Sequence, residues 1–144
     1  MGLSCGGKGF LPLLLAATLL AVGQARTLVV GGSEGWRFGV NYTGWAIQNA
    51  PFYINDKLVF KYDPPSESGY AYTVYSLPYL GNYVSCDFRR AKLLANETQG
   101  GGEGFEVVLS RWRAYYFASD GGDGYHCKDG PMKFIVVPAP RRDD

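Results

Sequence analysis

The sequence is poor in histidine, in cysteine and in net charge. Its 144 residues contain a single histidine, His126, and three cysteines, and 14 basic side chains stand against 13 acidic ones. Proteins that bind nucleic acid through broad electrostatics need a basic excess, so this balance argues against such a partner. One histidine also excludes any metal centre that requires two imidazoles. The length leaves room for one ordinary domain.

The sequence also lacks an apolar run long enough to cross a bilayer. The run from Phe10 to Val22 has about 13 residues, whereas a membrane-spanning helix needs about 20. A lysine precedes this run, and the small residues Gly23 and Ala25 follow it. This pattern predicts a secretory signal peptide over residues 1–25, cleaved before Arg26, with an uncleaved N-terminal anchor as the alternative.

The remaining chain is expected to form one domain, residues 26–138, followed by a short polar tail, residues 139–144. This tail lacks the hydrophobic segment of a lipid-anchor signal, so we expect a released, secreted protein. Two cysteines remain after removal of the signal, and in an oxidising compartment Cys86 and Cys127 are expected to pair. The sequons at Asn41 and Asn96 predict N-glycosylation.

Apolar and aromatic side chains in this domain mostly recur at every second residue, which is typical of half-buried strands. Glycine, proline and acidic clusters separate the runs and indicate turns. Two further segments, 41–48 and 78–86, are expected to form short helical turns. The pattern predicts an all-β sandwich, with strands over 57–62, 70–77, 105–109, 114–118 and 132–136.

Few side chains offer catalytic chemistry. Asp120, Asp123 and Asp129 surround His126 in the sequence, which raises a general acid–base pair or a weak Ca²⁺ loop as hypotheses. Aspartates beside glycines are more commonly turn formers, and the spacing does not match a calcium loop. The glycine-rich stretches 31–36 and 100–105 lack the features of a phosphate-binding loop. A hydrolase centred on His126 and Asp123 is kept as a minor alternative.

Two surface features could bind a carbohydrate. The run from Arg89 to Lys92 could contact an anionic glycan, although a solvated loop is the simpler interpretation. The chain also has three tryptophans and eleven tyrosines, which could stack on sugars or fill the core of a small sandwich. We expect most of these aromatic residues, a set that contains Trp36, Trp45 and Trp112, in the core. The expected exposed candidates are Tyr70, Tyr79 and Tyr125.

Six segments, in order, resemble the signature of the plant phytocyanins, small secreted proteins of the cupredoxin fold. They read VVGGSEGW, NYTGWA, FYINDKLVFKYD, NYVSC, YYFAS and YHCKDGPMKFIVV. The resemblance covers residues 27–137 and is strongest to the early nodulin-like branch, particularly its lamin-like members. It implies a Greek-key β-sandwich of two sheets and a disulfide between Cys86 and Cys127.

Copper-binding phytocyanins hold a blue copper with two His, one Cys and a weak axial Met or Gln. Transferred to this chain, the first His falls at Tyr72 or Thr73, and the Cys falls at Ala118 or Ser119. The second His matches His126, and the axial position falls near Pro131 and Met132. A blue copper site needs two imidazoles and a free thiolate, so we expect copper binding to be lost and no other cofactor to replace it.

The resemblance and the ligand positions together predict a copper-free phytocyanin domain rather than an enzyme. We expect a structural or recognition role at the plant cell surface or wall. A cell-wall glycan, a wall glycoprotein or a receptor ectodomain would be its partner. The alternative is a blue-copper electron-transfer protein, which the family as a whole suggests and the missing ligands oppose.

Overall fold

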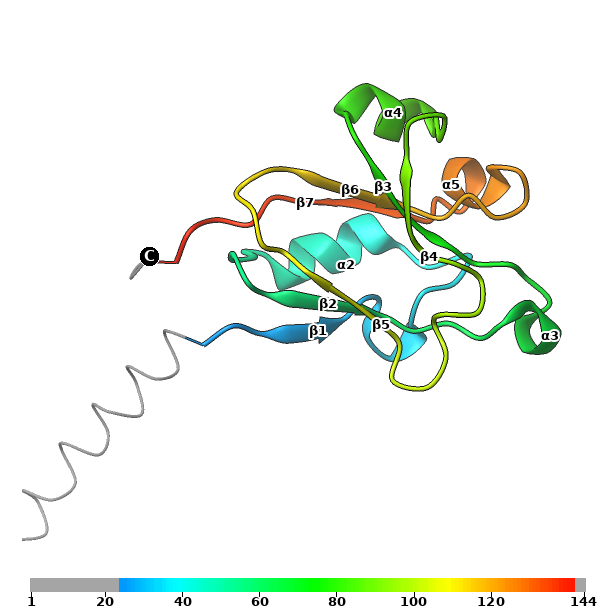
Figure 1. Cartoon of the computed structure of the whole chain (residues 1–144), viewed down its shortest axis with the longest axis horizontal. Helices are drawn as coiled ribbons and strands as arrows, with labels where there is room; N and C mark the ends of the chain where they lie inside the picture. The colour runs from blue at the N-terminus through cyan, green and yellow to red at the C-terminus, as the bar shows by residue number, and fades with distance from the viewer. Residues whose placement is uncertain (1–23, 142–144) are drawn as a thin grey trace, which may run out of the picture.

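Two β-sheets pack face to face in the computed structural model, which describes residues 24–141 (Figure 1). The first sheet has the strand order β1-β2-β5, and the second has the order β4-β3-β6-β7. This arrangement confirms the predicted sandwich. The first sheet contains β1 (Thr27–Val29), β2 (Lys57–Phe60) and β5 (Phe105–Val108), and the second contains β3 (Val74–Leu77), β4 (Lys92–Ala95), β6 (Tyr115–Ala118) and β7 (Lys133–Val136).

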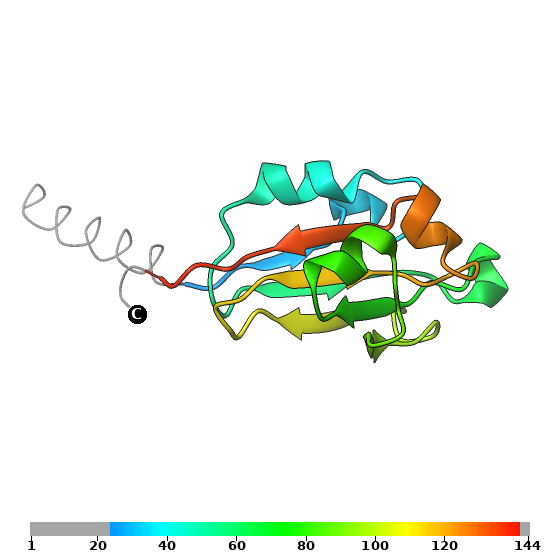
Figure 2. The ribbon, with the colours of Figure 1, turned by 90° about the horizontal axis from the view of Figure 1, so that it is seen from above.

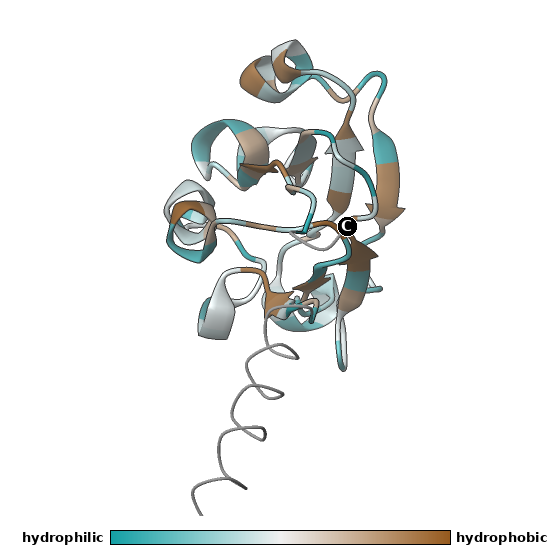
Figure 3. Ribbon diagram, turned by 90° about the vertical axis from the view of Figure 1, so that its left-hand side faces the viewer, coloured by the Kyte–Doolittle hydropathy of each residue, from teal (hydrophilic) through white to brown (hydrophobic). Residues whose placement is uncertain are grey.

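The strand pairing follows the hydrophobic alternation. β1 runs parallel to β2, and the four other pairings between these strands are antiparallel. In β7, Phe134 and Val136 are buried, whereas Ile135 between them is exposed. Figure 3 shows hydrophobic residues alternating with more polar ones along the strands. This period of two lets each strand present one face to the core.

The structure shortens one predicted strand considerably. The expected strand over 70–77 begins only at Val74. The Thr73 amide just before it bonds a side chain, Ser119 Oγ, at 3.2 Å instead of joining the β3 ladder. The apolar and aromatic pattern therefore starts at residue 70, several residues before the backbone of β3 begins to pair with its neighbours.

Both predicted helical turns are present, and two more helices occur in segments that were expected to be turns. α2 (Tyr42–Asn49) is capped by Asn41, whose Oδ1 accepts from the Gly44 amide at 2.9 Å. Figure 2 shows α2 lying alongside β7. The other helical elements are η1 (Gly32–Glu34), α3 (Pro65–Ser68), α4 (Leu80–Ser85) and α5 (Tyr125–Asp129).

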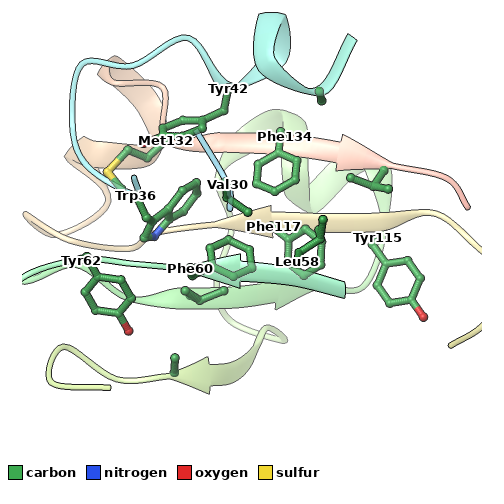
Figure 4. Close-up of a cluster of buried hydrophobic side chains, with 14 of the residues drawn as sticks. Val30, Trp36, Tyr42, Leu58, Phe60, Tyr62, Tyr115, Phe117, Met132 and Phe134 are labelled. Carbon is green, nitrogen blue, oxygen red and sulfur yellow. The ribbon is translucent and has the colours of Figure 1, made fainter. Parts of the chain in front are cut away.

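Aromatic side chains fill the space between the sheets (Figure 4). The Phe117 ring lies 5.2 Å from Phe134 and 5.4 Å from Phe60, measured between centroids. Trp36 is fully buried and donates its indole N–H to the Thr73 carbonyl at 2.9 Å. Trp112 is an exception to the predicted core, because 72% of it is exposed.

The disulfide connects the two short helices that flank the second sheet. Cys86 ends α4 and Cys127 lies in α5, with 6.0 Å between their Cα atoms. This pairing confirms the prediction. Across residues 24–141, every helix falls short of the length and apolarity that a membrane span requires. The predicted signal peptide lies almost entirely outside the described residues, as do residues 142–144.

Candidate functional site

The structure brings the four expected copper-ligand positions to one end of the sandwich. Figure 1 shows this end, where the chain before β3 meets the end of β6 and α5. The Tyr72 ring lies 5.3 Å from the His126 ring. The Met132 amide donates to the His126 carbonyl at 2.7 Å, and the Ser119 amide donates to the Met132 carbonyl at 3.1 Å. Ala118 is buried next to Ser119.

Aromatic rings enclose His126, and only 3% of this residue is exposed. The centroid of its imidazole lies 5.3 Å from Phe38, 5.7 Å from Tyr70 and 6.4 Å from Tyr125. We call these three rings, together with Tyr72, the aromatic enclosure. They place the imidazole in an apolar setting that resembles a small hydrophobic core.

The surroundings of His126 act on its pKa in opposite directions. Burial lowers its pKa, and the negative charge of Asp120 opposes that shift only in part. Within the described chain, the buried Nδ1 atom has no hydrogen-bond partner. A buried, unpaired nitrogen costs free energy, so this position is not optimised for stability alone.

Gly121 packs directly against that nitrogen. A Cβ atom at this position would lie 2.2 Å from His126 Nδ1 and 2.6 Å from the Ala71 carbonyl oxygen. Both distances are too short for any side chain without movement of the backbone or the ring. Glycine is therefore required for the loop to close over the imidazole.

Ser119 occupies one of the two positions expected for the cysteine ligand and has a structural role instead. Its hydroxyl oxygen accepts from the amides of Thr73 at 3.2 Å and Gly121 at 3.4 Å. Thr73 Oγ1 donates to the Asp120 carboxylate at 2.7 Å and accepts from the Asp120 amide at 3.0 Å. These bonds tie the end of β6 to the chain before β3 without any metal.

The side chains gathered here do not fit a blue copper centre. Such a centre needs two imidazoles and a thiolate, whereas these positions supply a phenol, a hydroxyl, one imidazole and a thioether. Cys86 and Cys127, the cysteines of the described chain, form the disulfide. In residues 24–141, no three His, Cys, Asp or Glu side chains gather closely enough to hold a metal ion.

The hydrolase alternative lacks its geometry as well. A general base needs an orienting partner on the other ring nitrogen, and His126 Nδ1 has none in the part of the chain described. Asp123 adopts a left-handed backbone conformation (φ 54°) and lines a shallow hollow with Asp120 and Lys128. These aspartates match the turn-forming role that was the simpler interpretation.

An open groove of about 420 Å³ adjoins the aromatic enclosure. Tyr70 and Tyr72 line both features, and 52% of Tyr70 is exposed. Glu34 and Arg37, which form an ion pair, line the groove together with Lys61 and Asp63, so the charges balance. We call it the aromatic groove, and its full lining is Glu34, Trp36, Arg37, Lys61, Tyr62, Asp63, Ser68, Tyr70, Tyr72 and Gly100 to Gly102.

Tyr79 is exposed as expected, but it lies at a different hollow. It precedes α4 and lines this second hollow with Asn82, Asp87, Arg89 and Arg90. Hydrogen bonds from Arg89 lower the pKa of Asp87 to about 2. The pairing leaves less of the basic run available to an anion, and a glycan contact there stays a prediction.

Both sequon asparagines are exposed. Asn96 Oδ1 accepts from the Thr98 amide at 3.0 Å and from the Thr98 hydroxyl at 2.9 Å. Asn41 uses its Oδ1 to cap α2. Neither site is obstructed by burial, and glycosylation at both stays a prediction.

Sequence reasoning missed Phe38 and Gly121 as parts of this site. Phe38 is one of many aromatic residues in loops, and nothing in its neighbours marks it as facing a histidine. Gly121 belongs to a glycine-rich turn whose members look equivalent in the sequence. Only the fold, which places these loops against His126, distinguishes them.

No family model matches the chain, but individual proteins do. Early nodulin-like protein 1 of Arabidopsis thaliana is 35% identical over 135 residues, covering 92% of this chain and 32% of that protein. Blue copper protein 1a of Medicago truncatula is 29% identical over 129 residues, covering 85% and 71%. The chain spans about a third of the length of the two early nodulin-like relatives it matches.

Two solved structures of plant proteins have a similar fold. A Cu²⁺ form of cucumber stellacyanin superposes with a TM-score of 0.62 at 19% identity, over 81% of this chain and 98% of that one. Spinach plantacyanin superposes with a TM-score of 0.50 at 26% identity, over 72% and 93%. The two-sheet sandwich is therefore a cupredoxin fold. The sequence relatives are early nodulin-like and blue copper proteins, and the structural neighbours are stellacyanin and plantacyanin, so together they support the phytocyanin family that the sequence resembles.

Proposed function

We propose that this chain is a copper-free phytocyanin domain with a structural or recognition role, not an enzyme and not an electron carrier. Its expected location is outside the cell, at the plant cell surface or wall. One observation carries the proposal: aromatic rings surround the one imidazole where the family's copper ligands are expected. With a phenol and a hydroxyl at two ligand positions, the scaffold lacks the donors that redox chemistry needs.

The aromatic groove is the proposed recognition surface, and a neutral cell-wall glycan is the ligand that its chemistry favours. Tyr70 offers an exposed ring face for stacking on a sugar. Two carboxylates and two cations are among the lining residues of the groove and can exchange hydrogen bonds with hydroxyl groups. Because these charges balance, the groove has no net attraction for an acidic polymer. A wall glycoprotein or a receptor ectodomain would be the alternative partner.

A copper titration tests the first half of this proposal. The secreted protein is titrated with Cu²⁺, followed by visible absorption and elemental analysis, beside Medicago truncatula blue copper protein 1a as a reference. We expect no blue absorption and no stoichiometric copper. A blue, stoichiometric centre would overturn the proposal and make electron transfer the function.

Electron transfer remains the second candidate because one structural feature favours a metal. His126 Nδ1 is a buried nitrogen that could ligate a metal, and it has no hydrogen-bond partner among residues 24–141. Two relatives are named blue copper proteins. The neighbouring residues supply no second imidazole and no thiolate. The titration therefore separates the two candidates directly.

Binding to an array of neutral wall oligosaccharides tests the second half. Tyr70→Ala removes the exposed ring of the groove and is expected to weaken binding about tenfold, the effect of one lost stacking contact. Tyr79→Ala is the matched control, since Tyr79 is 64% exposed but lies at the other hollow. Equal effects of the two substitutions, or no binding by the unmodified protein, would contradict the assignment of this groove.

A further inference from the structure

The opposite end of the sandwich buries a carboxylate that the proposed function does not use. Asp56 lies just before β2 and is 0% exposed. Its Oδ1 accepts from the Arg26 amide at 2.9 Å and from Arg141 Nη2 at 2.7 Å. Its Oδ2 accepts from the Tyr53 amide at 2.9 Å and lies 3.5 Å from Arg26 Nη2. Both carboxylate oxygens are therefore bound by donors.

The backbone nitrogen of Arg26 is held in place by contacts of Arg26 itself. The Arg26 carbonyl accepts from the Lys57 amide at 2.8 Å, which begins the pairing of β1 with β2. Its guanidinium donates to the carbonyls of Asn49 at 3.1 Å and Pro51 at 2.8 Å and lies over the Phe52 ring. The position of this nitrogen therefore does not depend on the residues before it.

Arg26 is also the first residue after the predicted signal peptide. We propose that Asp56 is a binding site for the α-ammonium group of the mature N-terminus at Arg26, created when the signal peptide is removed. Hydrolysis consumes one water, breaks the Ala25–Arg26 peptide bond, leaves a carboxylate on Ala25 and gives Arg26 a protonated amine. The inference rests on cleavage at this bond and is independent of what the aromatic groove binds.

Cleavage changes the charge of this donor and leaves its position unchanged. The neutral Arg26 amide already donates to Asp56 Oδ1, and the ammonium would donate from the same place. The bond from the amide already has an ionised acceptor, and the ammonium adds to it the attraction between a full positive charge and the carboxylate. Removal of the signal would therefore stabilise the mature fold directly.

Other charges near Asp56 moderate this gain without cancelling it. The guanidiniums of Arg26 and Arg141 face the same carboxylate and would repel the ammonium. The Arg26 side chain is 41% exposed, so solvent screens its charge. Lys57 Nζ lies 4.0 Å from Glu106 and has its own partner. Cleavage also removes the exposed contact between Arg141 Nη1 and the Gln24 carbonyl.

The test compares two secreted forms that differ only at the N-terminus. One is processed naturally, and N-terminal sequencing should show that it begins at Arg26. The other carries Gly-Ser inserted before Arg26, which restores a neutral amide at this nitrogen. Urea unfolding should show a folding equilibrium constant about fivefold to tenfold lower for the extended form, because its neutral amide lacks the attraction between the ammonium and the carboxylate.

Asp56→Asn provides the decisive comparison. In this background the extension should change the unfolding midpoint little, because the charged acceptor is gone. An equal effect of the extension in both backgrounds, no effect in the unsubstituted protein, or a natural N-terminus elsewhere would each overturn the proposal.

A second measurement applies if Asp56→Asn does not fold. Acylation of the α-amine is followed against pH by mass spectrometry in the native and the urea-unfolded protein, with the exposed Lys128 as internal control. Pairing with Asp56 should raise the pKa of the amine in the native state, so its acylation should begin at higher pH than in the unfolded chain. Identical pH dependence in the two states would overturn the proposal.

Discussion

His126 and Asp56 are buried at opposite ends of the sandwich, and their environments differ. At the end that carries α3 and α5, His126 lies among aromatic rings, and its Nδ1 has no partner in the described chain (Figure 1). At the end where β1 and β2 begin, Asp56 is bound by two backbone amides and two guanidiniums. Among residues 24–141, the imidazole nitrogen Nδ1 of His126 has no hydrogen-bond partner, whereas both carboxylate oxygens of Asp56 accept hydrogen bonds.

The difference follows from the cost of burying charge. An ionised group away from water needs partners, or it shifts its pKa and becomes neutral. Asp56 has such partners. His126 has only rings and a partly exposed Asp120, so burial dominates and lowers its pKa. We call the region around Asp56 the paired end and the region around His126 the unpaired end. The contacts of Asp56 stabilise the fold, whereas the imidazole of His126 contributes less to stability.

Removing one carboxylate from each end gives the largest expected contrast. Asp56→Ala should lower the free energy of unfolding by about 3 kcal/mol, because it removes the buried acceptor of two backbone amides and of the Arg141 guanidinium. Asp120→Ala should cost about 1 kcal/mol, the value of the one hydrogen bond that the Thr73 hydroxyl donates to the Asp120 carboxylate. Urea unfolding of the two variants measures the difference. Equal losses would show that the two ends do not differ as described.

A methyl group added beside the imidazole tests how tightly the unpaired end is packed. Gly121→Ala places a Cβ 2.2 Å from His126 Nδ1 and should destabilise the protein by about 2 kcal/mol through overpacking. Gly101→Ala is the control, because a Cβ there meets nothing within 4 Å. Thermal unfolding of both variants checks this. A Gly121→Ala variant as stable as its control would mean that the loop over His126 relaxes freely.

The sequence predicted much of the framework because its signals are local. Alternation over 105–109 and 132–136 corresponds to β5 and β7, and the segment 41–48 corresponds to α2 with its Asn41 cap. The short strands β1 (TLV) and β4 (KLLA) were not predicted, since each places two apolar residues side by side and shows no alternation. α3 and α5 were not predicted, because they lie in or beside segments rich in proline, glycine and aspartate, and these residue types are typical of turns.

The site was predictable only where the family signature provided positions. The signature pointed to Tyr72 or Thr73, to Ala118 or Ser119, to His126 and to the region of Met132. The structure places these positions at one end of the sandwich, although Ala118 packs in the small cluster with the disulfide. The cluster at Asp56 could not be read from the sequence, because its partners lie 30 and 85 residues away along the chain. Contacts at such separations are set by strand pairing and chain topology. Nothing in a local pattern encodes them.

The smallest expected effect concerns pH at the unpaired end. Because burial lowers the pKa of His126, the unfolded chain binds a proton at higher pH than the folded chain. Stability should therefore be fully present above the usual pKa of histidine and decrease as the pH falls through it. His126→Phe keeps a ring in the aromatic enclosure without a titrating group and should remove this part of the pH dependence. The urea unfolding midpoints of the unsubstituted protein and of His126→Phe are measured at neutral and at mildly acidic pH. Identical pH profiles of the two proteins would show that His126 does not contribute to the pH dependence of stability.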